Sequence, residues 1–94
     1  MFNSTNGTCS LCNDIVDIID CEIHVANSSI NIIENIVSVF CHSLIIPLAK
    51  KECNFLLDNI QLIINYLIKG LTPNSICEKL GLCKKSFIWI NFNY

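Results

Sequence analysis

Six of the seven cysteines in this 94-residue chain fall into three close pairs, and these pairs constrain the fold more than any other feature. The pairs lie near the start, the middle and the end of the chain: Cys9 and Cys12, Cys41 and Cys53, Cys77 and Cys83. In a short chain, so many cysteines usually form disulfides in an oxidising compartment. A zinc module, the alternative, usually has two pairs of closely spaced ligands, and only the first pair here has that spacing. The pattern therefore favours disulfides, and six cysteines allow 15 pairings.

Size and composition favour one small domain. A single domain of 94 residues has a marginal core unless cross-links support it. Hydrophobic residues make up 52% of the chain and charged residues 15%, and no apolar run reaches the 18 residues of a membrane-spanning helix. Residues 1–10 are polar and lack the hydrophobic region of a signal peptide. If the protein is secreted, we therefore expect that its signal peptide has been removed or that this chain is a segment of a precursor.

Charge and glycosylation motifs indicate the surroundings of the protein. The net charge is −2, with six lysines and no arginine, which argues against nucleic acid as a partner because such proteins need a basic surface. Three Asn-x-Ser/Thr motifs make Asn3, Asn6 and Asn27 candidate glycosylation sites. Together with the cysteines, they favour a secreted glycoprotein.

Apolar residues recur at helical spacing, which predicts an all-α fold. We expect helices over residues 9–23, 30–40 and 47–69 and a short helix from Thr72–Pro73 to Gly81, with a turn at residues 42–43. The third helix is expected to bend near Asp58–Asn59 and to end at Gly70, which adopts a left-handed conformation without cost.

The expected domain organisation has three parts. Residues 1–8 form a disordered segment, residues 9–85 form four to five short amphipathic helices stapled by three disulfides, and residues 86–94 form an aromatic tail. No internal repeat interrupts this order.

The cysteine order and the closing segment resemble the saposin-like family of lipid-interacting domains. Residues 72–83, TPNSICEKLGLC, are similar to the end of that family's domain: a proline, then Ile-Cys, then a hydrophobic turn into the last cysteine. The sequon at Asn27 follows the first expected helix, where saposins often carry one. The resemblance covers residues 9–83, about four fifths of the chain, and implies a saposin B-type fold related to saposins and amoebapores.

The family's disulfide pairing is first with sixth, second with fifth and third with fourth. On this chain it implies the disulfides Cys9–Cys83, Cys12–Cys77 and Cys41–Cys53. Cys21 departs from the family pattern and lies about 180° from Cys12 on the first helix. It is interpreted as a free thiol, as half of an intermolecular disulfide in a dimer, or as a mispairing partner. Redox catalysis by Cys9 and Cys12 is disfavoured because both thiols are expected to be bonded.

Two apolar faces are candidates for lipid contact. Helix 30–40 is apolar over more than half of its circumference, and helix 47–69 carries a second apolar stripe opposite its main one. A small bundle that buries both faces is the alternative. We expect paired helices to separate at hinges near residues 42–47 and 69–73. The tail aromatics, Trp89 among them, anchor at a headgroup interface, pack on the bundle or belong to the next segment of a precursor. The predicted lipid-contacting residues are Ile33, Val37, Phe40, Phe55, Leu56, Ile60, Leu62, Tyr66 and Trp89.

His24 and His42 are candidate pH sensors. Imidazole ordinarily takes up a proton near pH 6.5, and protonation of both would change the formal net charge from −2 to 0. That change would reduce repulsion from anionic membranes. The alternative is that both are surface histidines at helix ends. Amoebapores carry a histidine directly before the last cysteine, whereas this chain has Leu82 there, so the match to histidine-triggered oligomerisation fails.

The resemblance implies a lipid-interacting protein, and no catalytic triad, carboxylate pair, cofactor motif or metal-ligand spacing indicates an enzyme. The wide apolar faces favour a membrane-permeabilising, pore-forming, antimicrobial effector. The acidic balance and the Asn27 sequon favour a saposin-type activator that presents lipids to a hydrolase, and a non-lipid secreted interaction module is the third alternative. Expected partners are anionic membrane lipids, a second copy of the chain or a higher oligomer, and a lipid hydrolase. The expected location is outside the cell or in a lysosomal, phagosomal or granule lumen.

Overall fold

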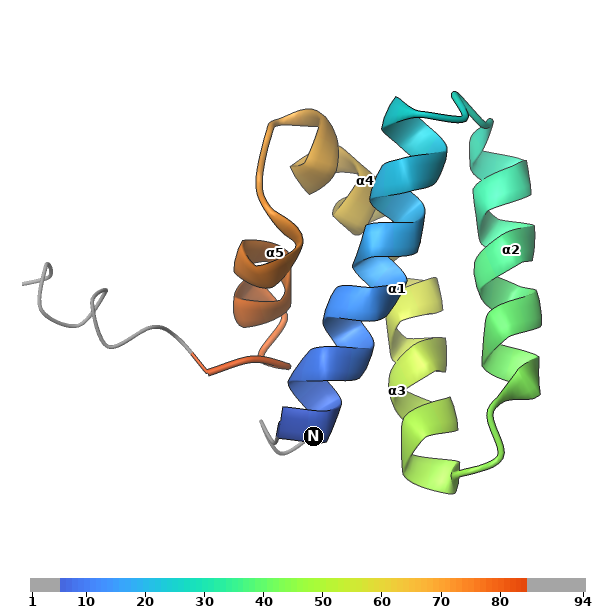
Figure 1. Cartoon of the computed structure of the whole chain (residues 1–94), viewed down its shortest axis with the longest axis vertical. Coiled ribbons are helices and arrows are strands. Elements are labelled where there is room, and N and C mark those ends of the chain that lie inside the picture. Colours follow the sequence, from blue (N-terminus) through green and yellow to red (C-terminus); the bar gives the residue numbers. More distant parts are fainter. Residues whose placement is uncertain (1–5, 85–94) are drawn as a thin grey trace, which may run out of the picture.

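The computed structural model describes residues 6–84, which form five α-helices (Figure 1). The helices are α1 (Asn6–His24), α2 (Ile30–Ser43), α3 (Pro47–Asp58), α4 (Ile60–Ile68) and α5 (Pro73–Lys79). No strand occurs within these described residues. The predicted all-α fold is confirmed.

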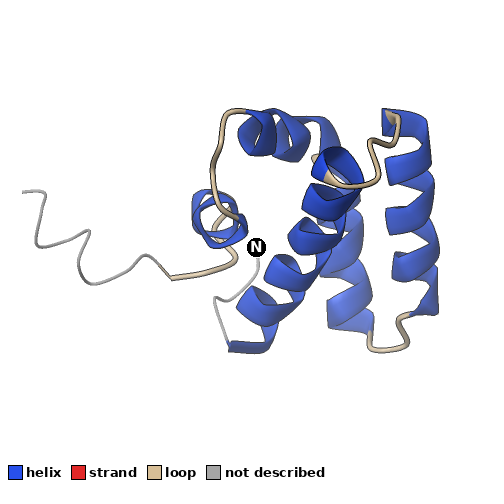
Figure 2. Cartoon of the chain, turned by 45° about the horizontal axis from the view of Figure 1, so that its top comes forward, coloured by secondary structure: helices blue, strands red, loops and turns tan. Residues whose placement is uncertain are grey.

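Helix α1 lies at the centre of the molecule and packs on all four other helices. On one side of it, α2 and α3 run alongside each other as a helical hairpin, and on the other side α5 contacts α1 and α4 (Figures 1 and 2). The α2–α3 hairpin therefore meets the rest of the molecule through α1 and α4.

Each helix contributes one stripe of side chains to a single apolar core. The stripes follow from spacings of three and four residues, which place side chains on one side of a helix. The core residues are Cys12, Ile15, Val16 and Ile19 of α1, Ile33, Val37 and Cys41 of α2, Cys53 and Leu56 of α3, Ile60, Ile63, Ile64 and Leu67 of α4, Ile76 and Cys77 of α5, and Leu82 and Cys83 beyond it. The core is thus built from aliphatic side chains and disulfide sulfur.

Two glycines end α4 and the closing turn after α5, as their positions in the sequence predict. Gly70 and Gly81 have φ angles of 95° and 79°, in the left-handed region that favours glycine. After α4, the amides of Gly70 and Leu71 donate to the carbonyls of Leu67 and Tyr66. This is the Schellman arrangement, which satisfies carbonyls that the helix leaves open.

Local polar groups define the other helix boundaries. Thr72 is the N-cap of α5, its hydroxyl accepts from the amide of Ser75 at 3.2 Å, and Pro73 occupies the first turn. Asn59 separates α3 from α4, where its side chain donates to the carbonyl of Phe55 at 2.8 Å. The predicted bend in the third expected helix is confirmed as a break between two helices.

Two boundaries differ from the prediction. Residues 6–8 belong to α1 although their polar composition predicted disorder, because Thr8 is only 7% exposed and packing supports the extra turn. The predicted turn at residues 42–43 is wrong, because α2 continues to Ser43. The Ser43 hydroxyl donates to the carbonyl of Phe40 at 2.6 Å, and the backbone first becomes extended at Leu44. The predicted aromatic tail, residues 86–94, lies outside the described residues.

Candidate lipid-interacting surface

Three disulfides hold the helices in two groups. Cys9–Cys83 and Cys12–Cys77 join α1 to α5 and to the segment that follows it, and Cys41–Cys53 joins α2 to α3. This is the pairing that the family resemblance implies. Because these cysteines are bonded to one another, the zinc alternative is excluded for them, and no group of three or more potential ligands within the described residues could hold a metal ion.

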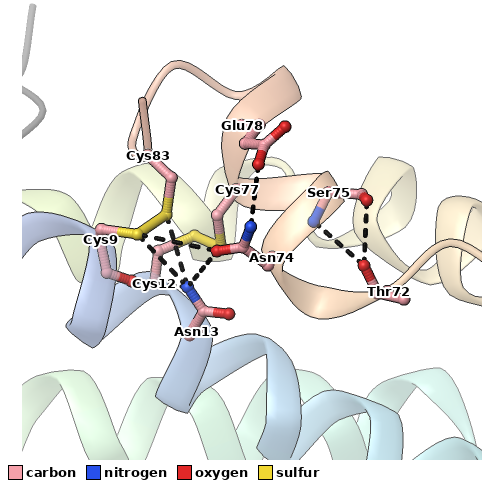
Figure 3. Close-up of a disulfide and its surroundings, with 9 residues drawn as sticks. All are labelled: Cys9, Cys12, Asn13, Thr72, Asn74, Ser75, Cys77, Glu78 and Cys83. Atoms are coloured by element: carbon pink, nitrogen blue, oxygen red, sulfur yellow. Dashed lines mark hydrogen bonds between the residues drawn. A yellow bond between two sulfur atoms is a disulfide. The ribbon is translucent and has the colours of Figure 1, made fainter. Parts of the chain in front are cut away.

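A polar network reinforces the junction of α1 and α5 beside the first disulfide (Figure 3). The side-chain amide of Asn13 donates to the carbonyl of Cys9 at 3.0 Å and to Oδ1 of Asn74 at 3.4 Å. Asn74 in turn donates to Oε2 of Glu78 at 2.8 Å. Two disulfides and this network together make the α1–α5 junction the most heavily cross-linked part of the fold.

The residues predicted to contact lipid do not form one exposed surface. Ile33, Val37, Leu56 and Ile60 are at most 3% exposed and belong to the core. Phe40, Phe55 and Tyr66 are half-buried against that core, Leu62 is 41% exposed, and Trp89 lies outside the described residues. Lipid could reach the four core residues only if the helices separate.

A different set of apolar side chains is exposed, at the turn between α2 and α3. Ile45, Ile46 and Leu48 are 91%, 64% and 60% exposed, and Lys50 and Lys51 follow them on the surface. We call these five residues the α2–α3 tip. Helical periodicity did not predict it, because two of the apolar residues precede Pro47 in a turn. The signal that could have identified it is the apolar run Leu-Ile-Ile-Pro-Leu at a position where turns usually carry polar residues.

The end of α1 and the turn that follows it make more polar contacts, although Val25 there is also 79% exposed. Nδ1 of His24 lies 2.6 Å from a carboxylate oxygen of Asp20, and the Ser28 hydroxyl donates to Glu22 at 2.6 Å. Asn27 is exposed and has a φ angle of 55°, in the left-handed region that asparagine tolerates. The predicted site residues at this end therefore lie in a polar, acidic environment.

The remaining predicted site residues are scattered. Cys21 is an exposed free cysteine on α1, and His42 is exposed near the end of α2. Asn6 is the first residue of α1, and Asn3 lies outside the described residues. His24 and His42 lie at the two ends of α2, so the fold does not bring the predicted pH sensors together.

Glu52 is a buried carboxyl that the sequence pattern did not single out. It is 2% exposed on the core side of α3, next to the Cys41–Cys53 disulfide, and its Oε2 has no hydrogen-bond partner among the described residues. Burial raises the pKa of Glu52 to about 7, because the ionised form loses its hydration. The core therefore contains a group that changes its charge near neutral pH.

Comparison with known proteins identifies the class. Residues 51–83 match the family model described as saposin-like type B, region 2. This segment contains Cys53, Cys77 and Cys83, which is one cysteine from each of the three disulfides. No curated protein and no solved structure gives a significant match. Together with the disulfide-linked helices, this match over part of the chain supports the saposin-like family.

The match suggests a general, lipid-interacting activity. Saposin-like domains are generally non-enzymatic modules that interact with lipids, and they are typically secreted or lysosomal. Within the described residues, no helix has both the length and the apolar character needed to cross a bilayer.

Proposed function

We propose that this protein permeabilises anionic membranes by opening, so that the α2–α3 hairpin separates from α1, α4 and α5. The observation that carries the proposal is the distribution of the disulfides. Two of them lie within the α1–α5 part and one lies within the hairpin, so apolar packing and two chain connections hold the parts together. Such packing loses little when acyl chains replace the protein partner.

Opening would expose the residues that the sequence analysis assigned to lipid. Ile33 and Val37 of α2 and Leu56 of α3 lie on the buried side of the hairpin. Once exposed, they form an apolar surface that lipid or a second opened copy can cover. Assembly of several opened copies would then breach the membrane, which is the activity of a secreted, pore-forming, antimicrobial effector.

The hinges that fit these connections differ from those expected from sequence. The Cys41–Cys53 disulfide bridges residues 42–47, and residues 69–73 connect two helices of the same part. The two connections between the parts are residues 25–29 and Asn59. We therefore propose that these positions, rather than residues 42–47 and 69–73, act as the hinges.

The second candidate is a lipid-binding activator that presents a lipid to a hydrolase. It is favoured by the net charge of −2, which opposes binding to anionic membranes, and by the exposed sequon at Asn27. In this alternative the opened protein closes around an extracted lipid. A non-lipid secreted interaction module is the third candidate.

Dye release and lipid transfer distinguish the three functions. The oxidised protein is added to phosphatidylcholine–phosphatidylglycerol vesicles at pH 5 and pH 7, and both leakage and movement of a labelled lipid to acceptor vesicles are measured. Leakage at micromolar protein supports permeabilisation, and lipid transfer without leakage supports the activator. The absence of both leakage and lipid transfer supports the non-lipid interaction module.

An engineered cross-link tests the opening itself. A disulfide added between α1 and α2 should abolish leakage, because it joins the two parts. The matched control is a disulfide added between α2 and α3, which stays within the hairpin and should leave leakage unchanged. Full activity of the α1–α2 cross-linked protein would contradict the opening mechanism.

Further assignments rest on the same proposal. We propose residues 9–85 as the lipid-interacting domain, a secreted, lysosomal, phagosomal or granule location, and glycosylation at Asn27. Exposed Cys21 is available for an intermolecular disulfide in a homodimer, which non-reducing electrophoresis detects. Exposed His24 and His42 remain candidates for acid-enhanced membrane attraction, which their replacement by glutamine should weaken at pH 5.

A further inference from the structure

The α2–α3 tip exposes apolar side chains that the fold leaves without cover. Ile45 is 91% exposed, and its neighbours Ile46 and Leu48 are exposed by more than half. The tip lies where the α2–α3 hairpin ends, at the same end of the molecule as the start of α1 (Figure 1). Side chains at such a projecting turn can enter an interface without any change in the packed core.

Val39, six residues before Ile45 in the chain, is a further exposed apolar side chain of α2. It is 63% exposed although α2 buries Val37 two residues earlier. The polar face of α2 is therefore interrupted by an apolar side chain on the approach to the turn. The tip and Val39 together place four exposed aliphatic side chains within ten consecutive residues.

The charge around the α2–α3 tip indicates which kind of partner it can bind. Residues 35–51 contain no aspartate or glutamate, and Lys50 and Lys51 are both exposed. The nearest carboxyls along the hairpin are Glu34, near the opposite end of α2, and buried Glu52. Residues 6–13, at the start of α1, also lack acidic side chains. A chain of net charge −2 thus carries a locally positive, apolar end, which complements an anionic lipid surface.

We propose that the α2–α3 tip docks the closed protein on anionic bilayers, with Ile45, Ile46 and Leu48 in the interface and Lys50 and Lys51 on lipid phosphates. The inference deepens the proposed function, because it names the surface that meets the membrane before any opening. It also fixes an orientation. Asn27 and the acidic side chains of the α1–α2 turn lie at the opposite end of α2, about 20 Å away for a helix of 14 residues, and face away from the bilayer.

Vesicle sedimentation tests the docking surface with a matched control. The triple variant Ile45→Ser/Ile46→Ser/Leu48→Ser removes the apolar tip, and Val25→Ser/Ile32→Ser/Ile68→Ser removes three other exposed aliphatic side chains. With phosphatidylcholine–phosphatidylserine vesicles, we expect the tip variant to bind about tenfold more weakly or worse, and the control to stay within about threefold of the unmodified protein. Circular dichroism melts verify that both variants are folded.

Charge substitutions test the lipid specificity. Lys50→Gln/Lys51→Gln should weaken binding to anionic vesicles and reduce its salt dependence, whereas Lys69→Gln/Lys84→Gln, which replaces exposed lysines elsewhere, should not. On pure phosphatidylcholine vesicles the two variants should bind alike.

The failure of this inference is distinguishable from the failure of the proposed function. If the unmodified protein binds and permeabilises vesicles and the tip variant does so equally well, the docking surface is wrong and the opening proposal stands. If the tip variant binds normally but loses a dimer seen by sedimentation velocity, the tip is a self-association surface and the docking proposal is overturned. If the unmodified protein neither binds nor permeabilises vesicles, both proposals fail.

Discussion

The turns at the two ends of α2 are held in their conformations by different kinds of bond. The α1–α2 turn, residues 25–29, exposes Val25 but is held by hydrogen bonds to the end of α1: Ser28 donates to Glu22 through its backbone and its side chain, and His24 pairs with Asp20 just before the turn. The α2–α3 turn, residues 44–46, exposes two isoleucines, and a disulfide between the flanking helices closes it. Hydrogen bonds to α1 order the first turn. The Cys41–Cys53 disulfide between the flanking helices holds the second turn without using the side chains of the turn itself.

The difference shows how a small domain can keep an apolar surface exposed without losing its shape. A turn that relies on a side-chain hydrogen bond needs a polar residue at the bonded position, as Ser28 is here. A turn held by a neighbouring disulfide can carry isoleucine, because its conformation does not depend on its own side chains. The comparison yields four predictions, in order of decreasing effect.

Removing the disulfide that closes the α2–α3 turn should have the largest effect. Cys41→Ala/Cys53→Ala should lower the free energy of unfolding by about 3 kcal/mol, the value that loop closure gives for a separation of 12 residues. Denaturant titration measures it. Cys21→Ser, which replaces an exposed cysteine outside the framework, is the control and should change stability by less than about 0.5 kcal/mol. If the unmodified protein and both variants are equally stable, the disulfide does not hold the α2–α3 turn and the contrast between the two turns is wrong.

Glu52, in the middle of α3, should make stability depend on pH. Its pKa of about 7 in the folded protein exceeds the ordinary value of 4.5, so the protonated carboxyl favours the fold. This contribution is complete below pH 4.5 and is lost as the pH rises through 7. Glu52→Gln should therefore stabilise the protein by about 2 kcal/mol at pH 8, allowing for solvent screening, and hardly at pH 4, as measured by denaturant titration.

Glu34→Gln, the same replacement at an exposed position of α2, is the matched control for that substitution. The result also bears on opening. If opening hydrates Glu52, a rise of pH through 7 favours opening. A Glu52→Gln protein with an unchanged pH profile would show that the carboxyl is already hydrated in the folded state.

Ser28→Ala tests the polar turn and should cost about 1 kcal/mol, because it removes a hydrogen bond to a carboxylate. The substitution preserves the Asn27 sequon, since Ser29 supplies the third position of the motif. Thermal unfolding at matched pH measures the loss. No loss of stability would mean that the turn does not depend on its internal bonds.

Ile45→Ser tests the apolar turn and should change stability least, by less than about 0.5 kcal/mol, because the side chain is 91% exposed. The same thermal unfolding experiment measures it. A loss comparable to that of Ser28→Ala would show that Ile45 supports the fold, and the contrast between the two turns would disappear.

Local sequence signals predicted most helix boundaries. Gly70 and Thr72 sit where left-handed backbone and N-capping chemistry require them, and Asn59 breaks a long apolar pattern. Such features depend on neighbours within a few residues, so the sequence alone contains them. The start of α1 was missed because Thr8 is held by tertiary packing, which a polar composition does not reveal.

The candidate site was less predictable, because apolar character does not say which side of a helix is covered. α2 is apolar over most of its circumference, yet Val37 is 1% exposed and Val39 is 63% exposed. Only the positions of α1 and α3 decide between them. The same holds for Glu52, whose burial follows from its orientation toward the core and not from its charge.

The sequence by itself determined the class of protein: the cysteine order, the helical periodicity and the closing segment from Pro73 to Cys83 each depend on residue identity and spacing. The tertiary structure alone decided which apolar residues are core and which form the α2–α3 tip. The physical reason is that burial is a property of the packed assembly. A side chain is removed from water by residues far away in the sequence, and Ile33 and Ile45 differ only in whether such residues are present.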